Sequence, residues 1–216
     1  NFTATSTWEF NNGTSWVAAT QAPGSNNNTL VQVGHTVTMN AAHSMNSGKS
    51  MTVNGSLNAG AFVISGGTFT LASGATLTVG SADGIASTGA TGNIQTTTRT
   101  FNAAANYVYA GAAAQITGTA LPTTITGSLA IQSGANTVTL TNAPTTTDSL
   151  SLQSGLFAIG SGATLNISAN GKVVAASGDF ATGATAGTIN FVGLGSFSGN
   201  SNPYNVYANS GVNFGS

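Results

Sequence analysis

The chain has 216 residues, 40% of them hydrophobic, with no cysteine, only 3% charged residues and a formal net charge of −1. An ordinary soluble domain is about one quarter charged, so a surface this neutral favours an assembled or tethered protein. The three basic residues, Lys49, Arg99 and Lys172, are scattered, which excludes a basic patch for nucleic acid, and the lack of cysteine excludes disulfides and thiolate metal sites.

Residues 1 to 35 come before any repeat and carry both tryptophans, Trp8 and Trp16. Bulky aromatic side chains cover an exposed core efficiently, so we expect this segment to cap the N-terminal end of the fold. The alternative is a platform on which sugars stack. The chain starts at Asn1, without Met or an apolar leader, which favours a mature segment excised from a longer protein.

A repeat follows the cap segment. Residues 36 to 83 divide into six blocks of eight, TVTMNAAH, SMNSGKSM, TVNGSLNA, GAFVISGG, TFTLASGA and TLTVGSAD. Apolar residues occupy the second place of every block and the fourth place of most, as with Ala61 and Val63 or Phe69 and Leu71, and small turn residues follow. Such alternation predicts short strands buried on one face, and the constant return predicts stacking. We predict an all-β parallel β-solenoid, with coils of either two or three blocks.

The same pattern continues after an interlude at residues 92 to 127. Gly67, Phe69 and the run from Ser73 to Leu77 recur as Gly155, Phe157 and the run from Ser161 to Leu165. Aromatic residues then gather in the tail, including Tyr204 and Tyr207, where we expect a second cap. The sequence therefore predicts an N-terminal cap segment (1–35), a first solenoid module with the interlude (36–127) and a second module with an aromatic-rich tail (128–216).

Candidate catalytic groups are few. Hydrolases and lyases built on β-helices need acids and bases that converge. The chain has four carboxylates, and no two of them share a repeat position: Glu9, Asp83, Asp148 and Asp179. We therefore predict that the protein is not an enzyme and has no cofactor. His35 and His43 are eight residues apart but lack a third strong metal ligand, so we expect no metal site and place both at surface turns.

Threonine triplets of the form T-x-T begin at Thr36, Thr68, Thr76 and Thr137. A regular ladder of threonine hydroxyls orders water, so the triplets suggest an ice-binding face as a minor possibility. Threonine is also a good strand former whose outward hydroxyl is simply solvated. The block count favours this second interpretation, because SMN, TVN and GAF interrupt the series.

Two long stretches of the chain, TRTFNAAANYVYAGAAAQITGTALP from Thr98 and GSLAIQSGANTVTLTNAPTTTDSLSLQSGLFAIGSGATLNI from Gly127, resemble repeats of very large bacterial surface proteins exported by type IX secretion, including gliding-motility adhesins. The opening, with Trp8, Trp16 and then LVQVGHTVTM from Leu30, is similar to the segment that precedes such repeats. The resemblance implies display and adhesion at the cell surface, and it assigns no ligand or catalytic residue.

We accordingly expect an extracellular, non-enzymatic structural or adhesive segment of a cell-surface fibre. Its partners would be copies or flanking modules joined end to end, and also surface glycans. The main alternative is a carbohydrate-binding module that uses Trp8, Trp16, Tyr204 and Tyr207. Asp148-Ser149-Leu150 matches a short bacterial O-glycan attachment pattern, which predicts modification of Ser149. No apolar run is long enough for a spanning helix, so we expect no membrane insertion.

Overall fold

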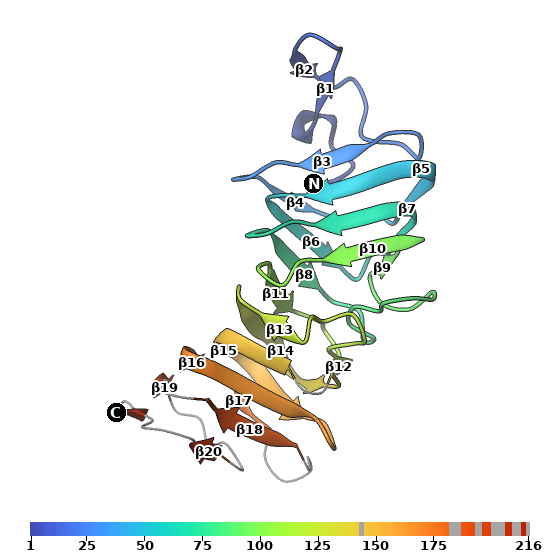
Figure 1. Cartoon of the computed structure of the whole chain (residues 1–216). Helices are drawn as coiled ribbons and strands as arrows, with labels where there is room; N and C mark the ends of the chain where they lie inside the picture. The colour runs from blue at the N-terminus through green and yellow to red at the C-terminus, as the bar shows by residue number, and fades with distance from the viewer. Residues whose placement is uncertain (143–144, 182–186, 193–195, 200–205, 209–212, 215–216) are drawn as a thin grey trace.

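The computed structural model describes residues 1–142, 145–181, 187–192, 196–199, 206–208 and 213–214. Strands make up 54% of the chain and helix 2%, and the chain forms a β-solenoid of about seven turns, as the repeat predicts (Figure 1). The elements are η1 (Thr5–Thr7), β1 (Glu9–Asn11), β2 (Trp16–Ala18), β3 (Thr29–Val31), β4 (Thr36–Thr38), β5 (His43–Val53), β6 (Ser56–Gly60), β7 (Ile64–Leu71), β8 (Thr76–Val79), β9 (Ile94–Gln95), β10 (Thr98–Phe101), β11 (Asn106–Tyr109), β12 (Gln115–Ile116), β13 (Thr124–Ile125), β14 (Leu129–Leu140), β15 (Thr145–Ile159), β16 (Thr164–Ala175), β17 (Asp179–Phe180), β18 (Thr188–Phe191), β19 (Ser196–Gly199), β20 (Val206–Ala208) and β21 (Asn213–Phe214).

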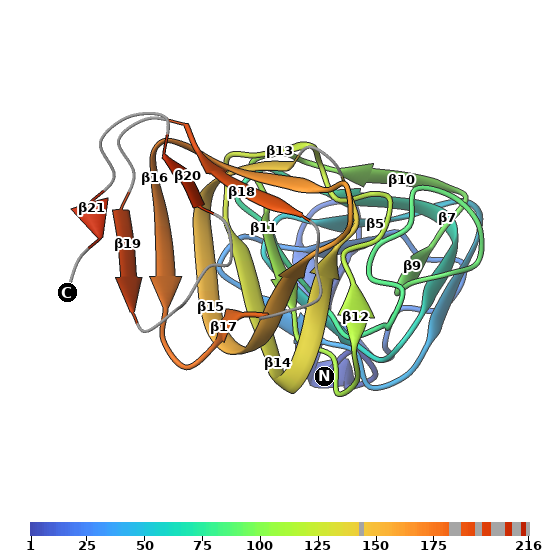
Figure 2. The same ribbon diagram turned by 90° about the horizontal axis from the view of Figure 1, so that it is seen from below.

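Each coil contributes strands to three parallel ladders, which form three walls around the core. The first ladder contains β3, the second halves of β5 and β7, and β10, and resumes with β13 and the first parts of β15 and β16. The second contains β4, β6, β8, β11, the first part of β14, the middle of β15 and the second half of β16. The third contains the first halves of β5 and β7 with β9, then β12 and the ends of β14 and β15. Figure 2 shows β14 and β15 bending from one wall to the next, so the coil is of the three-block kind.

The ladders stack the predicted core residues directly upon one another. In the second ladder the inward residues in register are Val37, Leu57, Leu77, Tyr107, Leu129, Leu150 and Val173. All of them are buried, and the core is continuous along the stack. The predicted apolar pairs are thereby confirmed at nearly every position.

One block of the repeat is out of phase with the prediction. Ala61 is exposed and Val63 is half-buried, whereas Ile64 is fully buried. A turn causes the slip, because the N–H of Phe62 donates to the carbonyl of Ala59 at 2.9 Å. Strand alternation restarts after this turn one residue later than the block count requires.

Coil length varies along the stack. Leu57 pairs with Leu77, a step of 77 − 57 = 20 residues, and Leu77 pairs with Tyr107, a step of 107 − 77 = 30. The wide coil contains an insertion at residues 80 to 93, which the side chain of Asn93 closes. Its Nδ2 donates to the carbonyls of Gly60 and Phe62, both at 2.8 Å, and its Oδ1 accepts from the N–H groups of residues 80 and 81. The interlude that follows supplies β9 to β13 to the same stack.

Arg99 ties the insertion to β10. Its guanidinium donates to the carbonyls of Thr96 at 2.9 Å, of Ala86 at 2.8 Å and of Gly89. The side chain is half-buried, and three backbone acceptors from two segments converge on it. The guanidinium of one side chain therefore donates hydrogen bonds to backbone carbonyls that have no backbone donor in this part of the insertion.

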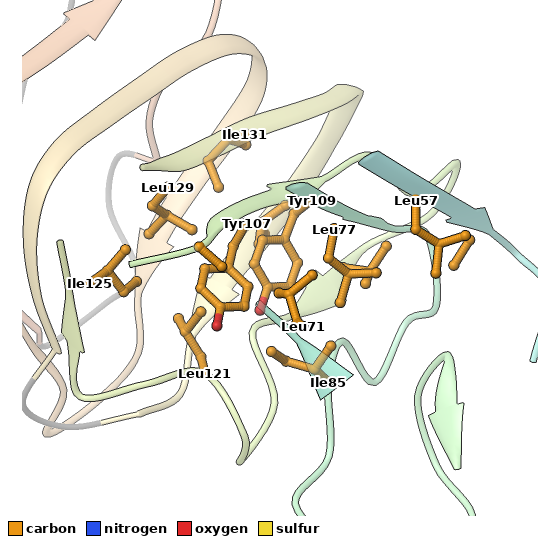
Figure 3. Packing of buried hydrophobic residues seen from close by; sticks show 14 of the residues in the cluster. Leu57, Leu71, Leu77, Ile85, Tyr107, Tyr109, Leu121, Ile125, Leu129 and Ile131 are labelled. Carbon is orange, nitrogen blue, oxygen red and sulfur yellow. The ribbon is translucent and has the colours of Figure 1, made fainter. Parts of the chain in front are cut away.

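Two tyrosines lie in the middle of the core. Tyr107 and Tyr109 both face inward from β11, and Figure 3 shows their rings among leucine and isoleucine side chains. Their hydroxyls donate to the carbonyls of Asn102 and Thr117 respectively, each at 2.7 Å. Burial raises the pKa of Tyr107 well above its ordinary value. Burial also raises the pKa of Tyr109, and the neighbouring Tyr107 raises it further. Both side chains are therefore neutral core residues whose hydroxyls have hydrogen-bond partners.

Phe2 and Trp8 cover the N-terminal end of the core. Phe2 is 3% exposed, and its N–H donates to the carbonyl of Thr38 at 2.8 Å. The indole Nε1 of Trp8 donates to the carbonyl of Phe2 at 2.7 Å, and the two rings meet edge to face. The β1–β2 hairpin projects beyond this cover, and β18 lies at the opposite end of the stack (Figure 1). Among the described residues, no helix is both long and apolar enough to cross a membrane.

Candidate binding site at the N-terminal end

A pocket of about 450 Å³ lies between the first coil and the segment that carries the hairpin. Its lining combines aromatic and polar side chains, contributed by η1, the hairpin and the turn between β3 and β4: Ser6, Thr7, Trp8, Glu9, Trp16, Leu30, Val31, Gln32, His35 and Val37. Both tryptophans that the sequence singled out are thus brought to one site. Glu9, Gln32 and His35 join them, and the sequence had not assigned these three residues to binding.

The two indoles have different surroundings. Trp8 is 9% exposed, and its N–H is already bound to the Phe2 carbonyl, so it forms a fixed wall of the pocket and also caps the core. Trp16 is 49% exposed on β2. The cap interpretation therefore fits Trp8, whereas Trp16 is available to a ligand.

Strand alternation gives the hairpin two distinct faces. In the antiparallel pair β1–β2, Phe10 lies opposite Val17, and Glu9 lies opposite Ala18. Because neighbouring side chains in a strand point to opposite sides, Glu9 and Trp16 share the face toward the pocket and Phe10 shares the other face with Val17. The Oδ1 of Asn12 fixes the hairpin loop by accepting from the N–H of residues 14 and 15 at 3.0 and 2.9 Å.

Gln32 and His35 flank a tight turn on the opposite side of the pocket. The N–H of His35 donates to the carbonyl of Gln32 at 3.1 Å, and Gly34 has a φ of 80° between them. The next coil holds this turn closely, because a Cβ on Gly55 would lie 2.1 Å from the carbonyl oxygen of Gln32. Such a close approach requires glycine. The two polar side chains therefore start from a fixed backbone.

Three polar side chains of the pocket are not used by the fold. Within the described chain, the side chains of Glu9, Gln32 and His35 make no hydrogen bond. Glu9 is the one carboxylate in the lining, and the described residues contain no group of three His, Asp or Glu side chains close enough together to hold a metal ion. The arrangement provides hydrogen-bond donors and acceptors beside an aromatic surface.

The other predicted site residues lie elsewhere. Tyr204 lies outside the described residues, and so does the side chain of Tyr207, whose backbone is in β20. Ser149 is half-buried in β15, and its N–H donates to Thr147 Oγ1 at 3.3 Å. His43 is a correction to the sequence analysis. It is 6% exposed in the third ladder and not at a surface turn, because three-block coils put it in register with Ile64.

The first ladder aligns hydroxyl side chains on three consecutive coils. The outward residues in register are Ser50 and Thr52 on β5, Thr68 and Thr70 on β7, and Thr98 and Thr100 on β10. Counting in blocks of eight misses this array, because the triplet on the first of these coils starts at Ser50. The five threonine hydroxyls make no hydrogen bond within the described chain.

No family model, curated protein or solved structure matches this chain.

Proposed function

We propose that this chain is a non-catalytic structural and adhesive segment of an extracellular cell-surface protein. The observation that carries the proposal is the β1–β2 hairpin, which projects beyond the capped end and exposes Phe10 by 58% and Val17 by 41% on its outer face. Exposed apolar side chains that cluster at the end of a stack are typical of an interaction surface. The nearly uncharged surface offers little repulsion between copies.

The edges of the hairpin support the proposal that copies join end to end. Among the described strands, β1 and β2 pair only with each other, so both keep an unpaired edge. Natural proteins usually block such edges with lysine, proline or a covering loop. Neither strand contains lysine or proline. We therefore propose that copies or flanking modules add through the hairpin and the aromatic-rich segment at residues 180 to 216, forming a fibre.

The test compares assembly of the native chain with that of a Phe10→Ser/Val17→Ser variant. We expect electron microscopy and light scattering to detect end-to-end assemblies of the native chain at low salt, and the variant to remain monomeric with an unchanged Tm. Leu156→Ser is the matched control, because Leu156 is 38% exposed on a wall of the stack far from the hairpin. A native chain that stays monomeric at high concentration would exclude the fibre.

The hydroxyl array favours a second candidate function, the ordering of water at an ice surface. Parallel strands are about 4.8 Å apart and outward residues along a strand about 6.6 Å apart, so Thr68, Thr70 and their neighbours form a regular grid. Each threonine offers a methyl group and an unused hydroxyl. Such a grid suits an ordered water layer better than an irregular, charged surface does.

Ice-growth measurements test this second candidate. Thr70→Lys places a charge at the centre of the array, whereas Thr78→Lys places the same charge on the second wall, outside it. We expect the native chain and Thr78→Lys to slow ice recrystallisation and Thr70→Lys to lose the effect. A native chain that leaves ice growth unchanged would eliminate this candidate.

A further inference from the structure

We infer that the N-terminal pocket binds a neutral saccharide, with Trp16 as the surface on which a sugar ring stacks and Gln32, His35 and Glu9 as hydrogen-bond partners. The inference deepens the proposed adhesive function, because it names a ligand class and the residues that take it. The pocket and the outer hairpin face consist of different side chains. Binding and assembly are therefore separable by experiment.

The pocket has the right size for a small polar ligand. Its volume of about 450 Å³ falls within the range of about 300 to 1,000 Å³ that is usual for small-molecule sites. Trp8 forms an immobile wall, and Trp16 stands on a hairpin whose loop is fixed by Asn12. The aromatic walls are preformed, so the side-chain entropy lost on binding comes mainly from Glu9, Gln32 and His35.

The aromatic surface matches one side of a sugar ring. A pyranose has a face of C–H groups and a rim of hydroxyls, and an indole presents a flat apolar surface with a polar edge. Trp16 is half exposed, so a ring that stacks on it removes apolar area of both partners from water. Trp8 has less free surface and serves as a side wall.

The polar groups match the hydroxyl rim. Each sugar hydroxyl donates and accepts, so its burial requires partners of both kinds. The Gln32 amide and the His35 imidazole each supply a donor and an acceptor, and the Glu9 carboxylate supplies acceptors. None of these three side chains is engaged within the described chain, so a ligand displaces water rather than an existing bond.

Other ligand classes fit this pocket less well. A phosphate or another anion meets a carboxylate and no lysine or arginine in the lining. A purely apolar ligand leaves the three polar side chains without partners. A metal ion has only Glu9 and His35 as strong ligands within the lining, fewer than a protein metal site needs. A neutral polyhydroxyl compound uses both the aromatic and the polar surface.

The experiment screens the native chain on a glycan array and measures binding of the retained neutral oligosaccharide by calorimetry and tryptophan fluorescence. We expect Trp16→Ala to weaken binding at least tenfold and to abolish the ligand-induced fluorescence change, and Gln32→Ala to weaken binding with the fluorescence change retained at saturation. Phe10→Ser is the control on the opposite hairpin face, and we expect it to bind like the native chain.

Two results would overturn the inference: an array that retains no neutral glycan, or a Trp16→Ala variant of native Tm that binds the glycan unchanged. Fold is checked by Tm, and Gln32→Ala keeps the test informative if Trp16→Ala unfolds. Assembly of the native chain without glycan binding would leave the adhesive fibre standing and reject the pocket. Glycan binding by a chain that stays monomeric would support the pocket and reject the fibre.

Discussion

The ring of Phe2 lies against the imidazole of His43, with centroids 4.7 Å apart. The second residue of the chain thereby closes the third ladder at its first described strand. His43 Nε2 is buried without a hydrogen-bond partner, and burial lowers the pKa of the imidazole below its ordinary 6.5. The folded cap therefore holds a neutral histidine.

The stability of the cap should depend on pH through His43. In the unfolded chain the imidazole takes up a proton below about pH 6.5, whereas in the folded chain its lowered pKa keeps it neutral to lower pH. The free energy of unfolding is therefore at its full value above that pH and falls below it. The loss is about 1.4 kcal/mol for each pH unit down to the folded pKa. We expect urea titrations at pH 7.5 and pH 5 to show this loss in the native chain and a smaller one in His43→Leu. Equal losses in both proteins would contradict the prediction.

Replacement of the two tryptophans should have unequal effects on folding. Trp8→Ala removes a buried indole from the cap and should lower the free energy of unfolding by about 3 to 5 kcal/mol. Trp8→Phe keeps most of the packing and loses the bond to Phe2, so it should lower the free energy of unfolding by about 1 kcal/mol. Trp16→Ala should change it by about 0.5 kcal/mol or less, because the side chain is half exposed. Similar losses for Trp8→Ala and Trp16→Ala would refute this assignment of roles.

Alanine variants of Gly66 and Gly74 distinguish two destabilising effects, a steric clash with the neighbouring coil and the strain of a positive φ. Their φ angles are 66° and 74°, but a Cβ on Gly66 would lie 1.9 Å from the Met45 carbonyl oxygen, and one on Gly74 would meet nothing within 4 Å. Gly74→Ala should lower stability by about 1 to 2 kcal/mol from the positive φ alone. Gly66→Ala should lower it by at least about 3 kcal/mol, because the neighbouring coil must also move. Thermal denaturation of the pair measures the difference, and equal Tm values would show that the coils yield without cost.

Arg99→Met should loosen the insertion without disturbing the stack. The carbonyls of Ala86 and Gly89 lose their charged donor, at a loss of about 1 to 3 kcal/mol of local stability. We expect faster amide hydrogen exchange at residues 84 to 92 and unchanged exchange in β14. Lys172→Met is the control, because Lys172 is exposed and makes no hydrogen bond within the described chain. Unchanged exchange near Ala86 would mean that the insertion holds its shape by itself.

Period-two alternation predicted most of the core residues, with the block of Ala61 and Val63 as an exception. Inward-facing residues of the alternation are fully buried: Val53, Phe69, Leu77, Phe157, Leu165 and Ile167 are each 0% exposed. The alternation follows directly from strand geometry, so it survives in any parallel stack. Counting residues in blocks of eight was less informative about which ladder each strand joins. Turns gain or lose residues without changing the alternation, so Phe69 lies in the first ladder and Phe157, its counterpart in the sequence, in the third.

Prediction of the pocket from the sequence was partial. The unusual aromatic content of residues 1 to 35 identified Trp8 and Trp16, but nothing local distinguished the buried indole from the exposed one. Gln32 and His35 carried only a weak signal, the Gly34 turn between two strands. Their part in the pocket depends on where the hairpin lies relative to the first coil, which is a tertiary relationship. His43 was misplaced for the same reason, because its burial follows from coil size and not from its neighbours in sequence.

The first coil and the coil that contains β18 lie at opposite ends of the stack, and this arrangement determines how the stack bears a pulling force (Figure 1). A force that pulls the ends apart acts along the stack and reaches a terminal coil first, and that coil is bonded to a neighbour on one side only. Coils should therefore detach one after another. A coil such as that from Leu57 to Leu77, with its step of 20 residues, releases up to about 70 Å of extended chain. Under the function proposed above, a surface tether built in this way would lengthen in steps under shear and so limit the peak force on its bound partner.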